Sequence, residues 1–124
     1  MTMRTISKSR RAGGPIPPYR IVKPGAVEGQ VVLAAAPTDA LKGTTGQLGV
    51  SSGERVDVDL GGIPEVELGG TVANGDPLTS DASGKAVKAQ PVAGANVRII
   101  GFADAAGTNG TVINYIFAPG VMQG

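Results

Sequence analysis

The side chains of this sequence that could do covalent chemistry are few. Ser7 and Lys8 are adjacent, and Ser83 and Lys85 are two residues apart, so either pair could form a serine-lysine dyad. Both pairs lie in segments that we expect to be flexible, where a lysine stays solvated and protonated. The sequence contains no histidine and no cysteine, which removes the commonest general base and the thiol nucleophile. We therefore predict that the protein is not an enzyme and has no catalytic residues.

Pairs of acidic residues could bind a metal ion. Asp57 and Asp59 lie two residues apart, and Asp76 and Asp81 are close in sequence, but calcium needs about six to eight oxygen ligands. We assign the first pair to the solvated face of a strand and the second pair to turns, and no EF-hand spacing is present. Without cysteine and histidine, zinc, copper, haem and iron-sulfur sites lack their usual ligands. We predict no metal site.

Lys85 is the remaining candidate for cofactor chemistry. The segment around Asn74 and Gly75 resembles the barrel-sandwich domains that carry biotin or lipoate on a hairpin lysine, which would place Lys85 at the tip. The flanking residues Ser-Gly-Lys-Ala-Val do not match those carriers, and fold analogies of this kind often mislead. The same residues do not match a phosphate-binding loop, since Ala86 follows the lysine. We predict no cofactor and no small-molecule substrate.

Charge is the most uneven property of the sequence. Residues 1–23 contain six basic and no acidic residues, whereas residues 24–124 contain five basic and ten acidic residues, so +6 and −5 give the net charge of +1. Residues 1–20 also contain two adjacent glycines and three prolines, which exclude a helix and favour an extended path. We predict an extended basic N-terminal arm at residues 1–20, outside the core, and an all-β domain at residues 21–124.

The predicted arm is the candidate binding segment, because its guanidinium groups can pair with carboxylates on another protein, in an association that salt weakens. The alternative is a nucleic-acid-binding or other small β-barrel interaction module that uses the same arm. On a nucleic acid the arginines would contact phosphates and Tyr19 would stack on a base. The acidic body disfavours this alternative, so we rank nucleic acid second. The partner-binding residues that we predict are Arg4, Lys8, Arg10, Arg11, Pro15, Pro17, Pro18, Tyr19 and Arg20.

Glycine and proline decide the fold class. There are 20 glycines and 9 prolines, and after residue 12 the longest interval without either is 111–118. A helix of about 11 residues would therefore carry a destabilising glycine or proline in its interior. We predict an all-β fold, a small β-barrel or β-sandwich with an extended N-terminal arm, and at most one helical turn at residues 38–41. The expected strands are residues 19–23, 30–36, 55–60, 65–68, 85–89, 97–103 and 111–117.

Two of these segments are described further by their patterns. Residues 55–60 alternate, with Val56, Val58 and Leu60 on one face and charged residues on the other, as expected for a half-buried strand. Residues 69–89 carry turn signals at Asn74-Gly75 and at 81–84 around short apolar runs, which predicts a hairpin. We expect this hairpin at the centre of the domain.

Three pieces of the sequence, in order, carry a family resemblance. They are Gly-Asp-Pro-Leu-Thr-Ser-Asp-Ala-Ser-Gly-Lys-Ala-Val at 75–87, the apolar run 97–103 with Ile-Ile-Gly-Phe-Ala, and the late strand 111–117, followed by Ala-Pro-Gly. Over about residues 20–120 the chain resembles the head decoration, or capsid cement, proteins of tailed bacteriophages. The resemblance implies a structural virion protein that binds the outer capsid surface between major capsid protein subunits and stabilises the mature head. It also implies a homo-oligomer, with a trimer favoured over a dimer or a monomer.

The composition of the core and the length of the apolar runs indicate how the chain assembles and where it is located. Aromatic residues make up 3% of the chain and tryptophan is absent, so the core must be built from smaller side chains. A core of this kind favours assembly with other copies or with a partner. No apolar run reaches the roughly 18 residues of a membrane span. We expect no membrane association, and synthesis in the host bacterial cytoplasm before incorporation into the virion.

Overall fold

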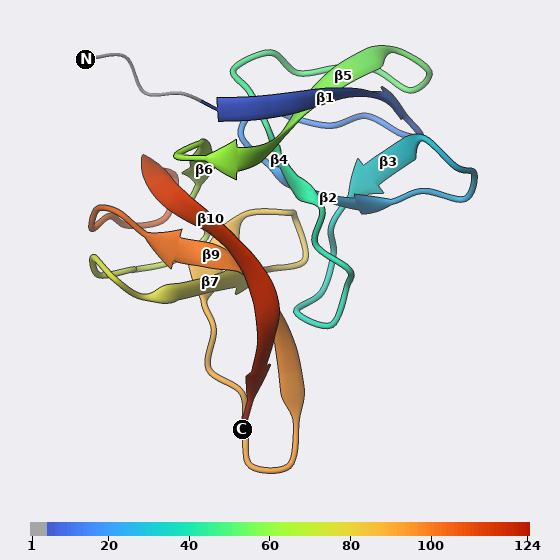
Figure 1. Ribbon diagram of the computed structural model, residues 1–124. Helices are drawn as coiled ribbons and strands as arrows, with labels where there is room; N and C mark the ends of the chain where they lie inside the picture. Colours follow the sequence, from blue (N-terminus) through green and yellow to red (C-terminus); the bar gives the residue numbers. More distant parts are fainter. Residues whose placement is uncertain (1–4) are drawn as a thin grey trace.

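The computed structural model describes residues 5–124, which form ten β-strands in two sheets, with no helix in this range (Figure 1). The described residues accordingly include no helix of a length and apolarity that would cross a membrane. The all-β prediction is confirmed. The first sheet contains β1 (Thr5–Ala12), β2 (Ile21–Pro24), β3 (Gln30–Leu33), β4 (Gly43–Thr45) and β5 (Arg55–Gly62), and the second contains β6 (Glu65–Glu67), β7 (Pro77–Ser80), β8 (Ala86–Lys88), β9 (Asn96–Ala103) and β10 (Val112–Gln123).

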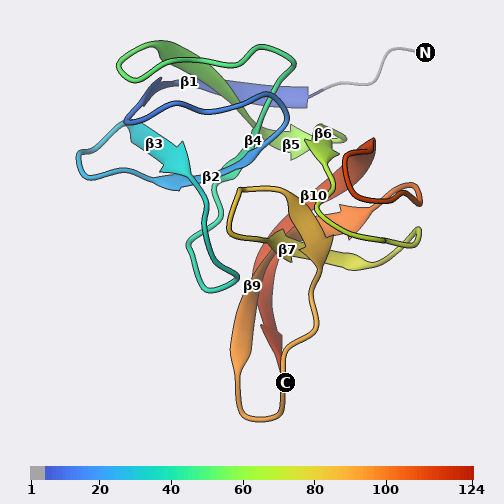
Figure 2. The same cartoon turned by 180° about the vertical axis from the view of Figure 1, so that it is seen from behind.

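The first sheet closes into a barrel in the order β1-β3-β2-β4-β5. Its neighbouring strands are antiparallel except for β1 and β3, which are parallel and pair over a short stretch. In β5 the predicted alternation is confirmed, since Val56 and Val58 are buried and Leu60 is half-buried against the same cluster. The barrel occupies one end of the molecule (Figures 1 and 2).

Residues 5–20 correct the prediction of an arm outside the core. β1 pairs with β5 along almost its whole length, and Ala12 and Ile16 are each 1% exposed within the barrel core. The composition did predict an extended backbone, but an extended segment also satisfies its hydrogen bonds well as a sheet strand. The prolines at 15, 17 and 18 lie after β1, in the connection to β2.

The second sheet has the order β6-β10-β9-β7-β8. The predicted hairpin is confirmed: β7 and β8 are antiparallel neighbours joined by the turn 81–84. Its expected place at the centre of the domain is wrong, because β8 is the last strand in the order of this sheet. β9 and β10 extend beyond the other strands as a two-stranded ribbon that leads away from the barrel (Figures 1 and 2). β10 continues past Pro119 through a bulge between Phe117 and Gly120. Gly101 lies opposite this irregularity, and a Cβ there would lie 1.9 Å from the Ile116 carbonyl oxygen, so close an approach requires glycine.

The two sheets share one body through a common core and several hydrogen bonds. One hydrophobic cluster contains Ile21 and Leu41 from the barrel side together with Leu78, Ile100 and Tyr115 from the second sheet. The buried hydroxyls of Thr44 on β4 and Tyr115 on β10 are 2.8 Å apart, in a hydrogen bond between the sheets. The Ile21 amide donates to the Gly84 carbonyl at 2.7 Å. The second sheet therefore fixes the position of β2 and β4.

Between β3 and β4 the predicted helical turn at residues 38–41 is wrong. The Asp39 carboxylate accepts hydrogen bonds from the amides of Ala35 (2.9 Å) and Ala36 (3.0 Å) and pairs with Lys23 at 3.2 Å. These bonds hold the chain in a tight turn after Ala34, and an aspartate side chain that bonds nearby amides commonly replaces a helical turn in this way.

Candidate functional site

β1 and β5 together expose one charged face. Cross-strand neighbours point to the same side of a sheet, so the register places Ser7 beside Asp59, Ser9 beside Asp57, and Arg11 beside Arg55. The Ser7 hydroxyl donates to the Asp59 carboxylate at 2.5 Å, and an Arg11 Nη donates to the Gly53 carbonyl at 2.8 Å. Two arginines that face each other across two strands repel.

The predicted binding residues Lys8, Arg10 and Arg11 all lie on β1. A hollow of about 240 Å³ at this end of the strand is lined by Ser9, Arg10, Arg11, Gly29 and Arg55, and we call it the arginine hollow. Within residues 5–124 no carboxylate forms an ion pair with Lys8, Arg10, Arg11 or Arg55. Arg10 also lines a second hollow, together with Lys42. Arg4 lies outside the described residues.

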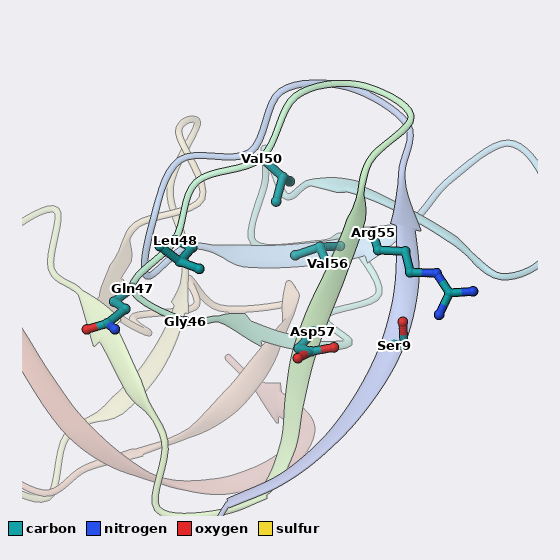
Figure 3. Close-up of a pocket in the computed structure, with 8 residues that line it drawn as sticks. All are labelled: Ser9, Gly46, Gln47, Leu48, Val50, Arg55, Val56 and Asp57. Atoms are coloured by element: carbon teal, nitrogen blue, oxygen red, sulfur yellow. The ribbon is translucent and has the colours of Figure 1, made fainter.

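A larger pocket of about 530 Å³ adjoins this face (Figure 3). Leu48 and Val50, from the loop after β4, and Val56 of β5 give it an apolar part, while Ser9, Arg55 and Asp57 line its polar side. Leu48 is 75% exposed. The charged face of β1 and β5 is therefore continuous with a pocket that can accept an apolar side chain.

The prolines and Tyr19 lie in the connection between β1 and β2. Pro15 and Pro18 are exposed, and the Pro17 carbonyl accepts a hydrogen bond from the Thr45 hydroxyl at 3.3 Å. Tyr19 has a φ of 57°, a left-handed conformation that is uncommon for residues other than glycine. Its amide donates to the Gly46 carbonyl at 3.0 Å, which helps hold this conformation. Tyr19 lines a different hollow from Arg10 and Arg11.

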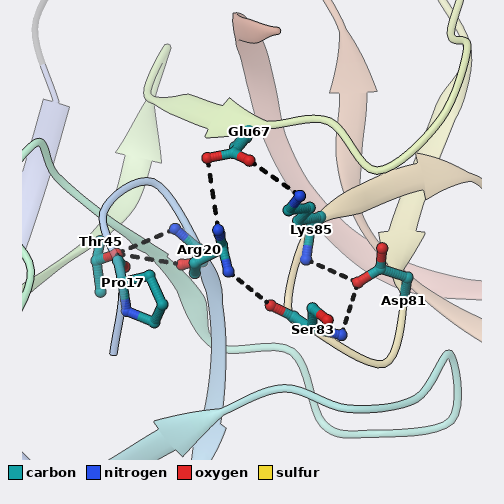
Figure 4. A network of polar contacts seen from close by, with 7 residues as sticks. All are labelled: Pro17, Arg20, Thr45, Glu67, Asp81, Ser83 and Lys85. Carbon is teal, nitrogen blue, oxygen red and sulfur yellow. Dashed lines mark hydrogen bonds and ion pairs between the residues drawn. The ribbon is translucent and has the colours of Figure 1, made fainter. Parts of the chain in front are cut away.

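Arg20 is separated from the other predicted binding residues. Its guanidinium group pairs with Glu67 at 3.5 Å and donates to the Ser83 carbonyl at 3.2 Å (Figure 4). Lys85 pairs with the other oxygen of Glu67 at 3.2 Å, and the Asp81 carboxylate accepts the amides of Ser83 and Lys85. This network joins the barrel to the β7–β8 turn, so Arg20 has a structural role in the protein.

The residues considered for chemistry have ordinary structural partners. The Ser7 hydroxyl donates to Asp59, and the Lys85 ammonium pairs with Glu67. Asp76 and Asp81 accept turn amides, as the assignment to turns requires. Among residues 5–124 no group of three or more acidic residues lies in an arrangement that could hold a metal ion.

The sequence did not indicate Arg55 as a binding residue. It was placed correctly on the polar face of its strand, but its position beside Arg11 depends on the pairing of β1 with β5. Sequence reasoning could have placed Arg55 beside Arg11 only if residues 5–12 had been predicted to form a strand that pairs with residues 55–60.

Comparison with known proteins assigns the sequence to a family. The model of a family described as phage cement protein matches residues 18–116, which is most of the chain. The chain belongs to the phage cement protein family. It is a structural protein associated with the virion capsid, and the resemblance of the sequence to capsid cement proteins is confirmed.

A solved structure shows the same fold. The chain is similar to the head fiber gp8.5 N base of bacteriophage phi29, with a TM-score of 0.70 and 19% identity, over 93% of this chain and 95% of that one. No curated protein sequence matches this cement protein.

Proposed function

We propose that this cement protein binds the outer capsid surface at junctions between major capsid protein subunits and stabilises the mature head. The observation that supports this most directly is the group of cations on β1 and β5 that form no ion pair within residues 5–124: Lys8, Arg10, Arg11 and Arg55. Arginine is suited to pairing with carboxylates on a protein surface, because its planar guanidinium can form two parallel hydrogen bonds.

The other predicted residues differ in how directly they take part in the proposed contact. Pro15 and Pro18 are exposed beside the barrel and form the rim of the contact surface, with Tyr19 and Pro17 half-buried behind them. Arg20 supports the surface through Glu67 and does not contact the capsid. Arg4 would extend the same positive charge.

We also propose that the protein acts as a homotrimer. The sheet exposes apolar side chains on β9 and β10: Phe102 is 38% exposed, Ile116 47% and Val112 36%, and Phe102 and Ile116 are cross-strand neighbours. Burial of such a strip between copies would add to a core that is poor in aromatic residues. Linked copies would also convert several weak capsid contacts into one strong attachment.

The test uses expanded heads that lack the cement protein. We would measure the copies bound per head, and the resistance of the heads to heat, for the wild type and the Arg10→Glu/Arg11→Glu variant. The variant should bind at least about tenfold more weakly at low salt, because two attractive charges become repulsive, and the difference should shrink as salt increases. Arg98→Glu, an exposed arginine on β9, is the control. Equal binding of all three proteins would contradict the proposal.

A further inference from the structure

The N-terminal half of β1 has an open edge. On one side β1 pairs with β5 from Thr5 to Arg11. On the other side its neighbour is β3, and the pairing is limited to Arg11 and Ala12. Residues 5–10 therefore have no strand partner on that side within the described chain. Figure 3 shows the same arrangement, with β1 at the border of the barrel beside β5.

The hydrogen bonds after this stretch show which backbone groups face the open edge. The amides of Arg11 and Gly13 donate toward β3, to the carbonyls of Gly29 (3.1 Å) and Val31 (2.8 Å), whereas the Ala12 amide donates to Glu54 beside β5. Since backbone groups alternate along a strand, Ser9 and Ser7 direct their N–H and C=O groups to the same side as Arg11. At Ser7 and Ser9 that side is open.

Side chains at one end of this edge are suited to an acidic group of a partner. The arginine hollow lies at the end of the open stretch and is lined by Arg10, Arg11 and Arg55. Arg11 and Arg55 are direct cross-strand neighbours of like charge, which costs stability unless an anion lies between them. Ile6, at the other end of the stretch, is 64% exposed and would be covered by a chain lying along the edge.

We propose that β1 binds an extended, acidic segment of a capsid subunit as an added strand, with a carboxylate of that segment in the arginine hollow. This inference rests on the proposed capsid-binding function and names the chemistry of the contact. Main-chain hydrogen bonds to Ser7 and Ser9 supply affinity, and the arginines select an acidic side chain.

The surroundings favour a peptide over a nucleic acid. Asp57 and Asp59 flank Ser9 and Ser7 on the outer face and would repel a continuous polyanion, whereas a peptide brings its carboxylates one at a time. The one tyrosine near the surface, Tyr19, lines a different hollow and is not beside the arginines for base stacking. A strand edge matches the repeat of a peptide backbone.

The first experiment tests the arginine hollow on heads. Arg11→Gln/Arg55→Gln should lower the affinity for heads at least about tenfold, because two charge-assisted hydrogen bonds are lost. Arg98→Gln removes an exposed arginine elsewhere and should bind like the wild type. Wild-type affinity in the double variant would overturn the inference.

The second experiment tests the backbone edge. Ser9→Pro removes the N–H that faces the open side and leaves the pairing with β5 intact, while Ser9→Ala removes the hydroxyl alone. Ser9→Pro should bind heads at least about fivefold more weakly, because one backbone hydrogen bond to the capsid segment is lost. Ser9→Ala should bind like the wild type. Equal affinity of both variants would overturn the added strand, provided that thermal unfolding shows both to be folded.

Hydrogen exchange separates this inference from the proposed function. Amides of residues 5–10 that exchange rapidly in the free protein should become protected when the protein is bound to heads. Bound protein with unprotected residues 5–10 would overturn the added strand and leave capsid binding intact. Failure of the wild type to bind heads would instead contradict the proposed function. If Arg11→Gln/Arg55→Gln lowers binding to single-stranded DNA but not to heads, the arginine hollow binds nucleic acid and the inference is overturned.

Discussion

Asp39 is a single residue that fixes the path of the chain between two barrel strands. Its carboxylate accepts two backbone amides, and the bond from Ala35 is the main reason why its pKa lies below the ordinary value of 3.8. Burial opposes this shift, and Lys23 assists it. The folded state therefore holds the ionised carboxylate more favourably than the unfolded state does.

We predict that Asp39→Asn destabilises the protein by about 1 kcal/mol at neutral pH. Because folding lowers the pKa, the stabilisation is complete above the ordinary value of 3.8 and is lost as the pH falls through the lower folded value. The difference between wild type and variant should therefore shrink on acidification. Urea unfolding at neutral and acid pH measures it, and a difference that grows toward acid pH would contradict the assignment.

Thr44 and Tyr115 form the other residue pair with a testable role. Both side chains are fully buried, their hydroxyls bond each other, and burial is the main cause that raises the pKa of Tyr115. Tyr115→Phe or Thr44→Val leaves one buried hydroxyl without its partner, at a cost of about 1–3 kcal/mol. The double variant removes both hydroxyls and should cost clearly less than the sum of the two.

A double-mutant cycle by chemical denaturation measures this coupling, and additive effects would show that the bond does not contribute. The wild type should also lose stability as the pH rises above the ordinary tyrosine value of 10.0, because only the unfolded state then releases the proton. Tyr115→Phe should remove that part of the alkaline loss.

At the scale of elements, the strands with clear alternation were predictable and β1 was not. Val56, Val58 and Val66 alternate with charged residues, and each is buried as expected. Residues 7–10 instead alternate serine with basic residues, a pattern without an apolar face. Among residues 6–12 only Ala12 is buried. The pairing of β1 with β5 is a tertiary contact that the local sequence does not encode.

The closure of the barrel by β1 gives a prediction opposite to that for a free arm. Deletion of residues 2–12 should expose the edge of β5 and open the core around Val56 and Val58, and should lower the unfolding temperature strongly or prevent folding. Thermal unfolding followed by circular dichroism measures the change. A truncated protein as stable as the full chain would show that β1 is an accessory strand.

At the scale of the whole molecule, part of the binding surface could be predicted from composition. The excess of positive charge before residue 24 indicated Lys8, Arg10 and Arg11, which all lie on β1, and Arg10 and Arg11 line the arginine hollow. Charge alone could not separate Arg20, whose partner Glu67 is far away in the sequence. It also could not add Arg55, which the register of two strands brings beside Arg11. Pairings between distant segments decide which charges remain available to a partner.

The assembly state belongs to the same scale and depends on the exposed apolar strip. If copies pack through Phe102 and Ile116, Phe102→Ser/Ile116→Ser should shift the protein from trimer to monomer in sedimentation experiments, because apolar area is no longer buried between copies. Val92→Ser, at an exposed residue in the loop before β9, should leave the trimer intact.

The Phe102→Ser/Ile116→Ser variant also tests how assembly affects binding to heads. A monomer retains the arginine hollow but loses the advantage of several linked contacts, so it should bind heads much more weakly and dissociate faster, with an unchanged dependence on salt per contact. Binding kinetics on immobilised heads measures both quantities. A variant that sediments as a monomer and still dissociates as slowly as the wild type would show that each copy attaches independently, through its own charged face.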